Sequence, residues 1–496
     1  MEEEEEEWEG KGYLYRKGKE DEGGVAVEGR RMMEGSMAKI RRDDETISAL
    51  IYLPIPIRHV DLKGPKGLGI KGGRSYEAAK GRLCPSFSAI YSAPKSNHQS
   101  IPTSMESRDD FRSILPFLPL ILRSSAVSWP PAVVEVLESI SKGPSHSNVN
   151  SGQLFALAIA DLRNSLGLFS LHSSASLGFS LFFDDLMDKD EAEKWFGEVV
   201  PRLADLLLRL PALLEAHYQN ASVFNGMETG LRLLESQQSG IVFLSQELIA
   251  ALLRNRANQE NKIKCIVHYF EKVCSDMPKG NVSFERKVLP LMNSPSNIVY
   301  PEADFWSNST ISLCRMEVHT TGLIEDQPTE ALEVDFANKY IGGSVLSRGC
   351  VQEEIRFMIN PELIVSMLFL PAMADNEAIE IVGAERFSNY TGYATSFRFS
   401  GDHVDEKSID TMGRRRTRIV AIDALRRPGN TQYGPECLVR ETNKAFCGFL
   451  DRHKPFEENV ISDKVIGNPD AAKVRLVLQR EIGVVVRLGE ILKLKL

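Results

Sequence analysis

The chain has 496 residues, of which 43% are hydrophobic and 26% are charged, and its formal net charge is −9 at pH 7. This composition is typical of globular proteins and excludes a wholly disordered chain, a collagen-like fibre and a disulfide scaffold. The acidic balance disfavours a protein that mainly binds the backbone of duplex DNA, while it allows a local site for an anionic ligand. The length predicts two or three domains.

The first residues, MEEEEEEWE, are typical of a solvated, disordered tail and not of a signal peptide, whose first region is positive. A partner-binding tail is the less favoured alternative. The longest apolar run, Ile114–Leu122, contains two prolines and is too short to cross a bilayer, so no transmembrane helix is expected. The seven cysteines form no CxxC pair, which predicts a reduced, intracellular protein without a zinc site or a disulfide framework.

Residues 1–108 are rich in Gly, Lys, Glu, Ser and Pro and predict disorder, with Ala49–Ile55 as a short piece of local strand or a contact segment. From Asp109 to about Val273, apolar residues recur at helical spacing. Pro211 falls within one such run and is expected to kink or end the helix. The expected helices are Ala132–Ile140, Asp161–Leu171, Glu191–Leu208, Ala204–Leu214, Phe243–Leu253 and Asn261–Val273.

After Val282 the pattern changes, because short β-branched runs now alternate with helical stretches. This alternation predicts an α/β layer structure with a central sheet. No internal repeat of twenty to fifty residues is present. The expected strands are Ala331–Phe336, Ile379–Val382, Ala394–Phe399 and Arg418–Ile422, and the expected helices are Glu362–Phe369 and Cys437–Phe449.

Three chemically informative features coincide in Val334–Pro361, which reads VDFANKYIGGSVLSRGCVQEEIRFMINP. Asp335 lies just inside a strand end, a Gly-Gly-Ser turn follows, and Gln-Glu-Glu comes about ten residues later. Successive amides in a glycine turn can form a nest for a pyrophosphate, although most such triplets are plain turns. Adjacent glutamates are common at helix starts. As catalytic groups, one could hold a sugar hydroxyl and the other could protonate a leaving oxygen, as glycosidic cleavage requires.

The string GGSVLSRGCVQEE resembles the signature of the poly(ADP-ribose) glycohydrolases, which is Gly-Gly-Gly, a short spacer and Gln-Glu-Glu. Its flanks VDFANKY and IRFMINPELI agree with that family, as do YTGYATSF, RRRTRIVAIDAL and NKAFCGFL further along. The upstream runs DFRSILPFLP, KWFGEVVPRLADLLLRLP and ENKIKCIVHYFEKVCSDMPKGNVSFERKVLP look like the helical accessory region of the plant members. The resemblance covers roughly residues 109–450.

The resemblance implies an α/β fold with a macrodomain-like core around a central mixed sheet, preceded by a helical accessory region and a disordered N-terminal segment. The expected divisions are residues 1–108, 109–280 and 281–496. The implied activity is hydrolysis of the ribose–ribose O-glycosidic bonds of poly(ADP-ribose), releasing ADP-ribose by carboxylate general acid catalysis without metal or cofactor. The implied partners are poly(ADP-ribose) chains on modified proteins in the nucleus and cytoplasm, with no duplex nucleic acid or membrane and an open oligomeric state.

The resemblance also assigns catalytic roles to three carboxylates. Glu354 would donate its proton to the leaving 2′-oxygen, Glu353 would orient the ribose hydroxyls, and Asp335 would support the site. Carboxylates, backbone amides and water suffice for this chemistry.

Further residues are expected to contact the substrate, namely Ile324, Glu325, Asn338, Gly342, Gly343, Ser344, Gln352 and Tyr393. Asn338 and Gln352 would form hydrogen bonds to it. Tyr393 would pack near the pyrophosphate or the adenosine, and Ile324 with Glu325 would contact the adenine.

The sequence departs from the family signature at three places. Ser344 replaces the third glycine, which costs about 1 kcal/mol or more if that position requires a positive φ. Only Arg254–Gln259 joins two helices that the family connects by a longer segment. After about residue 450, no Asn-Trp-Gly-Cys-Gly run or second glycine-rich loop follows, which predicts an atypical or truncated C-terminus and an incomplete core.

These departures support an alternative function, that of a catalytically impaired family member that binds ADP-ribose. A nucleotide-binding oxidoreductase is a third class, but it requires a glycine fingerprint that opens a helix, and the sequence contains none.

Overall fold

In the computed structural model, all the residues described below lie in one compact unit, Glu45–Leu496. The predictions for residues 1–104 and for the segment after residue 450 lie outside the described part of the chain. The structure describes residues 105, 108–115, 118, 128–165, 173–224, 226–253, 259–291, 300–308, 323–326, 332–425 and 429–450.

The first part of the described chain is helical, as the apolar spacing predicts. No helix among the described residues combines the length and the apolar character that a membrane span needs. Two π-helical turns, Leu181–Leu186 and Trp195–Val199, interrupt the α-helices. The helices are α2 (Asp109–Ile114), α3 (Pro131–Ser141), α4 (Pro144–Ser147), α5 (Gly152–Ser165), α6 (Ser173–Ser180), α7 (Lys189–Lys194) and α8 (Val200–Asn220).

Helix α8 continues through Pro211 to Asn220, so of the two outcomes expected of this proline, a kink or an end of the helix, the end does not occur. A proline lacks the amide that would bond to the carbonyl four residues earlier, which here is Leu207. The indole Nε1–H of Trp129 donates to that carbonyl oxygen at 2.7 Å. The side chain thus replaces the missing backbone donor.

The central sheet has five strands in the order β3-β4-β6-β9-β5. Only the β5–β9 pair among them is parallel, so the sheet is mixed, as predicted. Because β3 precedes residue 281, the sheet extends across the expected division at that point, and the division itself stays a prediction. The strands are β3 (Gly240–Ser245), β4 (Asn281–Val288), β5 (Leu332–Ala337), β6 (Glu377–Val382) and β9 (Arg418–Asp423).

Two predicted elements are wrong in part. The expected helix Phe243–Leu253 begins as the end of β3, and α9 (Gln246–Leu252) starts only after Ser245, whose hydroxyl accepts a hydrogen bond from the Leu248 amide. The expected strand Ala394–Phe399 begins as a 3-10 turn, in which Ala394 has a φ of 52°. Pairing of β3 with β4 makes the start of the first segment a strand, and the 3-10 turn at Ala394–Ser396 delays the strand in the second.

The remaining elements surround the sheet or connect its strands. They are β1 (Val223–Phe224), β2 (Met227–Glu228), α10 (Glu260–Ser275), α11 (Ala303–Ser307), η6 (Ile324–Asp326), α12 (Gln352–Ile359), η7 (Pro361–Leu368), β7 (Ser388–Thr391), η8 (Ala394–Ser396), β8 (Arg398–Asp402), η9 (Gly429–Tyr433) and α13 (Pro435–Phe449).

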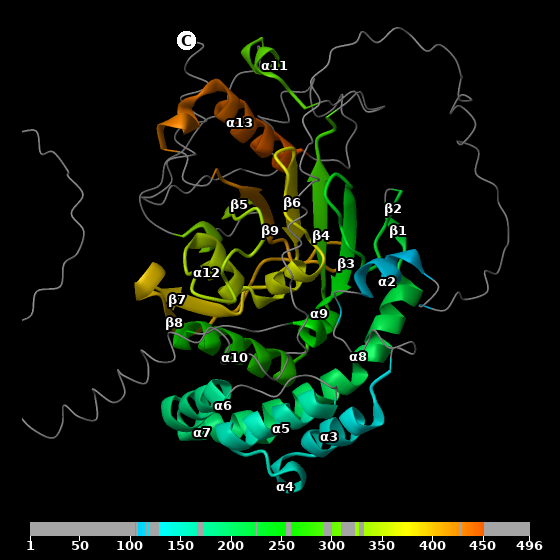
Figure 1. Ribbon diagram of the computed structural model, residues 1–496, viewed down its shortest axis with the longest axis vertical. Coiled ribbons are helices and arrows are strands. Elements are labelled where there is room, and N and C mark those ends of the chain that lie inside the picture. The colour runs from blue at the N-terminus through cyan, green and yellow to red at the C-terminus, as the bar shows by residue number, and fades with distance from the viewer. Residues whose placement is uncertain are drawn as a thin grey trace, which may run out of the picture. The chain divides into compact units, whose positions relative to one another are not determined.

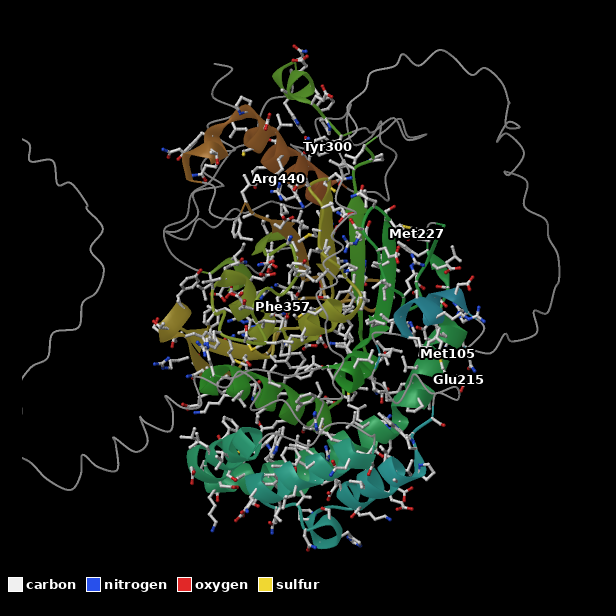
Figure 2. The ribbon with its side chains drawn as sticks, viewed as in Figure 1. Met105, Glu215, Met227, Tyr300, Phe357 and Arg440 are labelled. Carbon is white, nitrogen blue, oxygen red and sulfur yellow. The ribbon has the colours of Figure 1, made fainter. Side chains whose placement is uncertain are left out.

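Helix α12 packs on β5 and α10, and α13 packs on β6 and β9 (Figure 1). Phe357 of α12 is fully buried among the packed side chains (Figure 2). The segment that connects β5 to α12, residues 338–351, is called the site loop below. It begins at the carboxyl end of β5, the edge where ligands commonly bind in α/β sheets.

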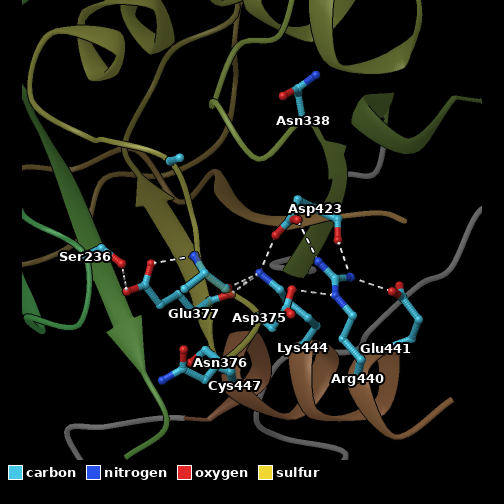
Figure 3. Close-up of polar contacts among 12 residues, drawn as sticks. Ser236, Asn338, Asp375, Asn376, Glu377, Asp423, Arg440, Glu441, Lys444 and Cys447 are labelled. Carbon is cyan, nitrogen blue, oxygen red and sulfur yellow. Dashed lines mark hydrogen bonds and ion pairs between the residues drawn. The ribbon is translucent and has the colours of Figure 1, made fainter. Parts of the chain in front are cut away.

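A buried ionic network fixes α13 to the sheet beside the start of the site loop (Figure 3). Lys444 is paired with Asp423 and also donates to the Glu377 carbonyl at 2.8 Å. Arg440 donates to Asp423 Oδ2 at 2.8 Å. Since Asp423 pairs in register with Ala337, the last residue of β5, the network holds the end of β9 next to the site loop.

Candidate active site

Asp335 on β5 is a buried carboxyl group with no hydrogen-bond donor. Its side chain belongs to a residue that is 1% exposed, and neither oxygen has a partner among the described residues. Burial raises the pKa of Asp335 and the charge of Glu354 raises it further, while Arg356 opposes the shift. Asp335 is therefore either a neutral acid or a carboxylate whose charge is stabilised by no hydrogen bond from the described residues.

Glu353 is the second residue of α12 and reaches back to the site loop. Its Oε1 accepts the Gly342 amide at 2.7 Å, and its Oε2 accepts the Asn338 amide at 3.0 Å. Burial raises the pKa of Glu353, and repulsion from Asp335 adds to that effect, although the two amides oppose it. Two close buried carboxyl groups cannot both ionise easily, so the pair favours retention of a proton near neutral pH.

Glu354 points into the same loop from the next position of the helix. Its Oε1 accepts the Ser344 amide at 2.9 Å, and its Oε2 accepts the Val351 amide at 3.0 Å. The side chain is buried, and its contact with Val351 also satisfies an amide that the first turn of α12 leaves free. Neighbouring helix positions diverge by about 100°, and the two glutamates accordingly bind different amides.

Two glycines of the loop, Gly343 and Gly349, lie so close to these carboxylates that a side chain would collide with them. Gly343 has a φ of 50°, and a Cβ built there would lie 2.5 Å from Glu353 Oε2 and 2.7 Å from Glu354 Oε1. A Cβ on Gly349 would lie 2.5 Å from Glu354 Oε1. Ser344 is not among the residues with positive φ, so the strain anticipated for a serine at this position does not arise.

The amides of the Gly-Gly-Ser turn are all engaged within the protein. Those of Gly342 and Ser344 donate to the two glutamates, and that of Gly343 donates to the Tyr340 carbonyl at 3.0 Å. Two amides of the turn thus bind the carboxyl groups of α12. Contact with a diphosphate stays a prediction.

The side chain of Gln352 is bonded to the backbone of β5. Its Oε1 accepts the Phe336 amide at 3.0 Å, and its Nε2 donates to the Val334 carbonyl at 3.4 Å. The Gln352 amide donates to the hydroxyl oxygen of Tyr393 at 3.3 Å. Both residues therefore position the start of α12, and their contacts with substrate stay a prediction.

Asn338 is exposed at the start of the site loop, and its Oδ1 accepts the Tyr340 amide at 3.0 Å. The expected adenine contacts lie on η6, apart from this hydrogen-bonded group. There Glu325 is buried and accepts the Tyr390 hydroxyl at 2.6 Å, while Ile324 is half-buried. The structure thus joins the carboxylates to the site loop directly, whereas the hydrogen bond from Tyr390 joins the η6 pair to β7.

The sequence analysis missed Lys262, a fully buried lysine on α10. Its Nζ donates to the carbonyls of Val345 at 2.9 Å and Ser347 at 3.0 Å, both in the site loop. A signal was present, because Lys262 stands four residues before Ile266 and seven before Tyr269, in the apolar stripe of an amphipathic helix. A lysine at such a position requires a buried partner.

Family models match both regions of the chain. Residues 303–467 match the macro domain fold of poly(ADP-ribose) glycohydrolase, and residues 187–257 and 254–286 match its helical domain. The macrodomain-like fold and the helical region implied by the resemblance are confirmed.

Similar proteins carry the same name. The chain is 56% identical to poly(ADP-ribose) glycohydrolase 1 of Arabidopsis thaliana over 394 residues, 73% of this chain and 70% of that protein. It is 52% identical to the probable poly(ADP-ribose) glycohydrolase 2 of Arabidopsis thaliana over 385 residues, 71% and 74% of the two chains. Poly(ADP-ribose) glycohydrolase 2 of Caenorhabditis elegans is 35% identical over 209 residues, 40% and 41%. The signature around Glu353 and Glu354, the macro domain fold and this extent of identity show that the chain belongs to the poly(ADP-ribose) glycohydrolase family of enzymes.

Proposed function

We propose that this chain hydrolyses the ribose–ribose O-glycosidic bonds of poly(ADP-ribose) on modified proteins, with Glu354 as the general acid. The observation that carries the proposal is the arrangement of Glu353 and Glu354, two buried glutamates at one helix start that hold a glycine loop beside the buried acid Asp335. Family membership supplies the substrate class.

In the proposed reaction, protonated Glu354 gives its proton to the leaving 2′-oxygen as the bond from that oxygen to the anomeric carbon breaks. The ribose becomes cationic in the transition state and is stabilised by nearby carboxylate charge. Water then adds to the anomeric carbon and returns a proton to Glu354, so that ADP-ribose leaves and the acid is restored.

The hydrogen bonds leave room for this cycle. Each oxygen of Glu354 accepts one amide, and a carboxyl oxygen has a further lone pair. The amides fix the orientation of the carboxyl group in both protonation states. Glu353, whose oxygens likewise have one amide each, retains acceptor capacity for ribose hydroxyls. Burial and the charge of Glu354 raise the pKa of Asp335 and of Glu353, which favours retention of a proton on these two groups.

The test is release of ADP-ribose from automodified polymerase by the purified chain and by Glu354→Gln. We expect a rate loss of about 10²- to 10⁴-fold, since the variant lacks the transferable proton. Glu406→Gln, at an exposed carboxylate of the same fold, is the matched control and should keep the full rate. Equal rates for Glu354→Gln and the unchanged chain would exclude Glu354 as the acid.

A second candidate function is ADP-ribose binding with impaired catalysis. It is favoured by the engagement of the Gly342, Gly343 and Ser344 amides within the protein. Calorimetry with ADP-ribose separates the two functions. Heat of binding without product release supports the second, heat with release supports the first, and no heat at millimolar ligand removes the second.

We also propose that the chain acts in the nucleus and the cytoplasm. Poly(ADP-ribose) chains on nuclear and cytoplasmic proteins would be the substrates, and fractionation of cells that express the tagged chain is the direct measurement. Recovery in a single other compartment would contradict it.

A further inference from the structure

A cation from the helical region reaches into the site loop. Lys262 on α10 is 0% exposed, and its Nζ is 2.9 Å from the Val345 carbonyl oxygen and 3.0 Å from that of Ser347. Helix α10 lies in the helical-domain match at residues 254–286, whereas the loop lies in the macro-domain match. Lys262 therefore connects the two regions at the site itself, as does Gln259, whose Nε2 donates to the Arg348 carbonyl at 3.2 Å.

The Val345 and Ser347 carbonyls follow closely in sequence on the Ser344 amide, which donates to Glu354, the expected general acid. Ser344 donates its amide to Glu354 Oε1 at 2.9 Å, and Val345 is the next residue. The Ser344 carbonyl in turn accepts the amides of Ser347 at 2.9 Å and Gly349 at 3.1 Å. The loop is thus a set of tight turns, and its Val345 and Ser347 carbonyls both accept hydrogen bonds from the ammonium group of Lys262.

We propose that Lys262 is a positioning residue for the glycosidase reaction. It holds the site loop in the conformation in which the Ser344 amide donates its hydrogen bond to Glu354. The proposal rests on the proposed role of Glu354. Without the ammonium group, the Val345 and Ser347 carbonyls would be left with lone pairs directed into a buried space. The loop would then rearrange, and Glu354 would lose the orientation given by its amide.

The positive charge gives the contact a pH dependence. Burial lowers the pKa of Lys262 to about 8, against opposing contributions from Cys350, Glu354 and Cys265. Cys350 belongs to the site loop, Glu354 to α12 and Cys265 to α10. Lys262 is mainly charged at pH 7, and a charged donor binds carbonyls more strongly than a neutral amine. The hold on the loop should weaken as the pH rises above about 8.

The first measurement follows hydrogen exchange in residues 341–349 of the unmodified chain, corrected for the intrinsic rate at each pH. We expect protection of this segment to fall between pH 7 and pH 9, while residues 353–359 of α12 keep theirs. Because this readout involves no turnover, it stands even if Glu354 is not the acid. Constant protection of residues 341–349 across that range would overturn the proposal.

The second measurement compares Lys262→Met with Lys264→Met, on the same helix. Lys264 is partly exposed and pairs with Glu260 at 2.9 Å. We expect Lys262→Met to lower kcat for ADP-ribose release by about 10- to 100-fold, as misplacement of a catalytic group does, with a smaller change in KM. It should also speed exchange of residues 341–349 selectively, and Lys264→Met should do neither.

The third comparison uses Lys262→Arg, whose guanidinium stays protonated at every pH of interest. It should retain more activity than Lys262→Met and extend the activity to higher pH. Faster exchange throughout the molecule in Lys262→Met, or normal exchange and activity, would each overturn the proposal. Should Lys262→Met fail to fold, the pH series on the unmodified chain still decides.

Discussion

Gly343 has a structural role in the site loop that its predicted contact with substrate does not include. The sequence suggests that a glycine turn there approaches a diphosphate. In the structure, the space that a side chain would need is occupied by oxygens of Glu353 and Glu354. The glycine is therefore necessary before any substrate arrives, because it allows the carboxylates to reach the loop amides.

Substitution of Gly343 by alanine should separate this role from that of an ordinary turn glycine. We expect Gly343→Ala to lower the free energy of unfolding by about 1–3 kcal/mol, because of the positive φ and the approach to two oxygens, and to reduce ADP-ribose release. Gly197→Ala is the control, since a Cβ there meets no atom within 4 Å. Urea unfolding measures both, and equal loss in the two variants would contradict the explanation.

At the scale of elements, the sequence predicts structure well where one segment determines its own conformation. The helices α3, α10 and α13 and the strands β5, β6 and β9 lie where periodicity places them. The run over 243–253 differs from its prediction at the start, because its apolar residues suit a helix equally well and only the pairing of β3 with β4 fixes residues 243–245 as strand. The site is similar: the signature predicts Glu353 and Glu354, whereas the contribution of Lys262 depends on contacts across eighty residues of sequence.

Helix α8 offers a test of a contact that local patterns cannot reveal. Trp129→Phe removes the donor to the Leu207 carbonyl, and we expect a loss of about 1–2 kcal/mol in the free energy of unfolding. In the background of Pro211→Ala, a backbone amide is available for that carbonyl, so the same substitution should cost less. A double-mutant cycle by urea unfolding measures the difference, and additive effects would show that the indole does not replace the proline amide.

At the scale of the whole molecule, buried ions join elements that are distant in sequence. Glu380 on β6 pairs with Lys287 on β4 and with Arg418 on β9. Lys287 also donates to the carbonyls of Gly448 and Leu450, each at 2.9 Å, at the end of α13. The carboxylate of Glu380 thus links strands β4, β6 and β9 through ion pairs, and Lys287 extends this link to the end of α13.

This carboxylate predicts how stability depends on pH. Burial alone would raise the pKa of Glu380, but Lys287 and Arg418 outweigh that effect and lower it to about 2. A pKa lower in the folded than in the unfolded chain contributes stability above about pH 4.5, which is lost as the pH falls towards 2. Glu380→Gln should therefore be about 3–5 kcal/mol less stable at pH 7, with a smaller deficit at pH 3.

Urea unfolding at pH 7, 5 and 3 measures this difference. Glu406→Gln, at an exposed position, serves as the control and should follow the unmodified chain. A deficit for Glu380→Gln that is constant with pH would show that ionisation of Glu380 contributes nothing to the effect.

The bond between Gln352 and β5 has a consequence for the behaviour of the protein in solution. Among the described strands, β5 is at the end of the sheet order, and an outer edge with free backbone groups invites strands from other molecules. The amide group of Gln352 matches the donor and acceptor spacing of a neighbouring strand, and it occupies the positions at Val334 and Phe336. We therefore expect this glutamine of the family signature also to hinder the addition of a foreign strand at that edge.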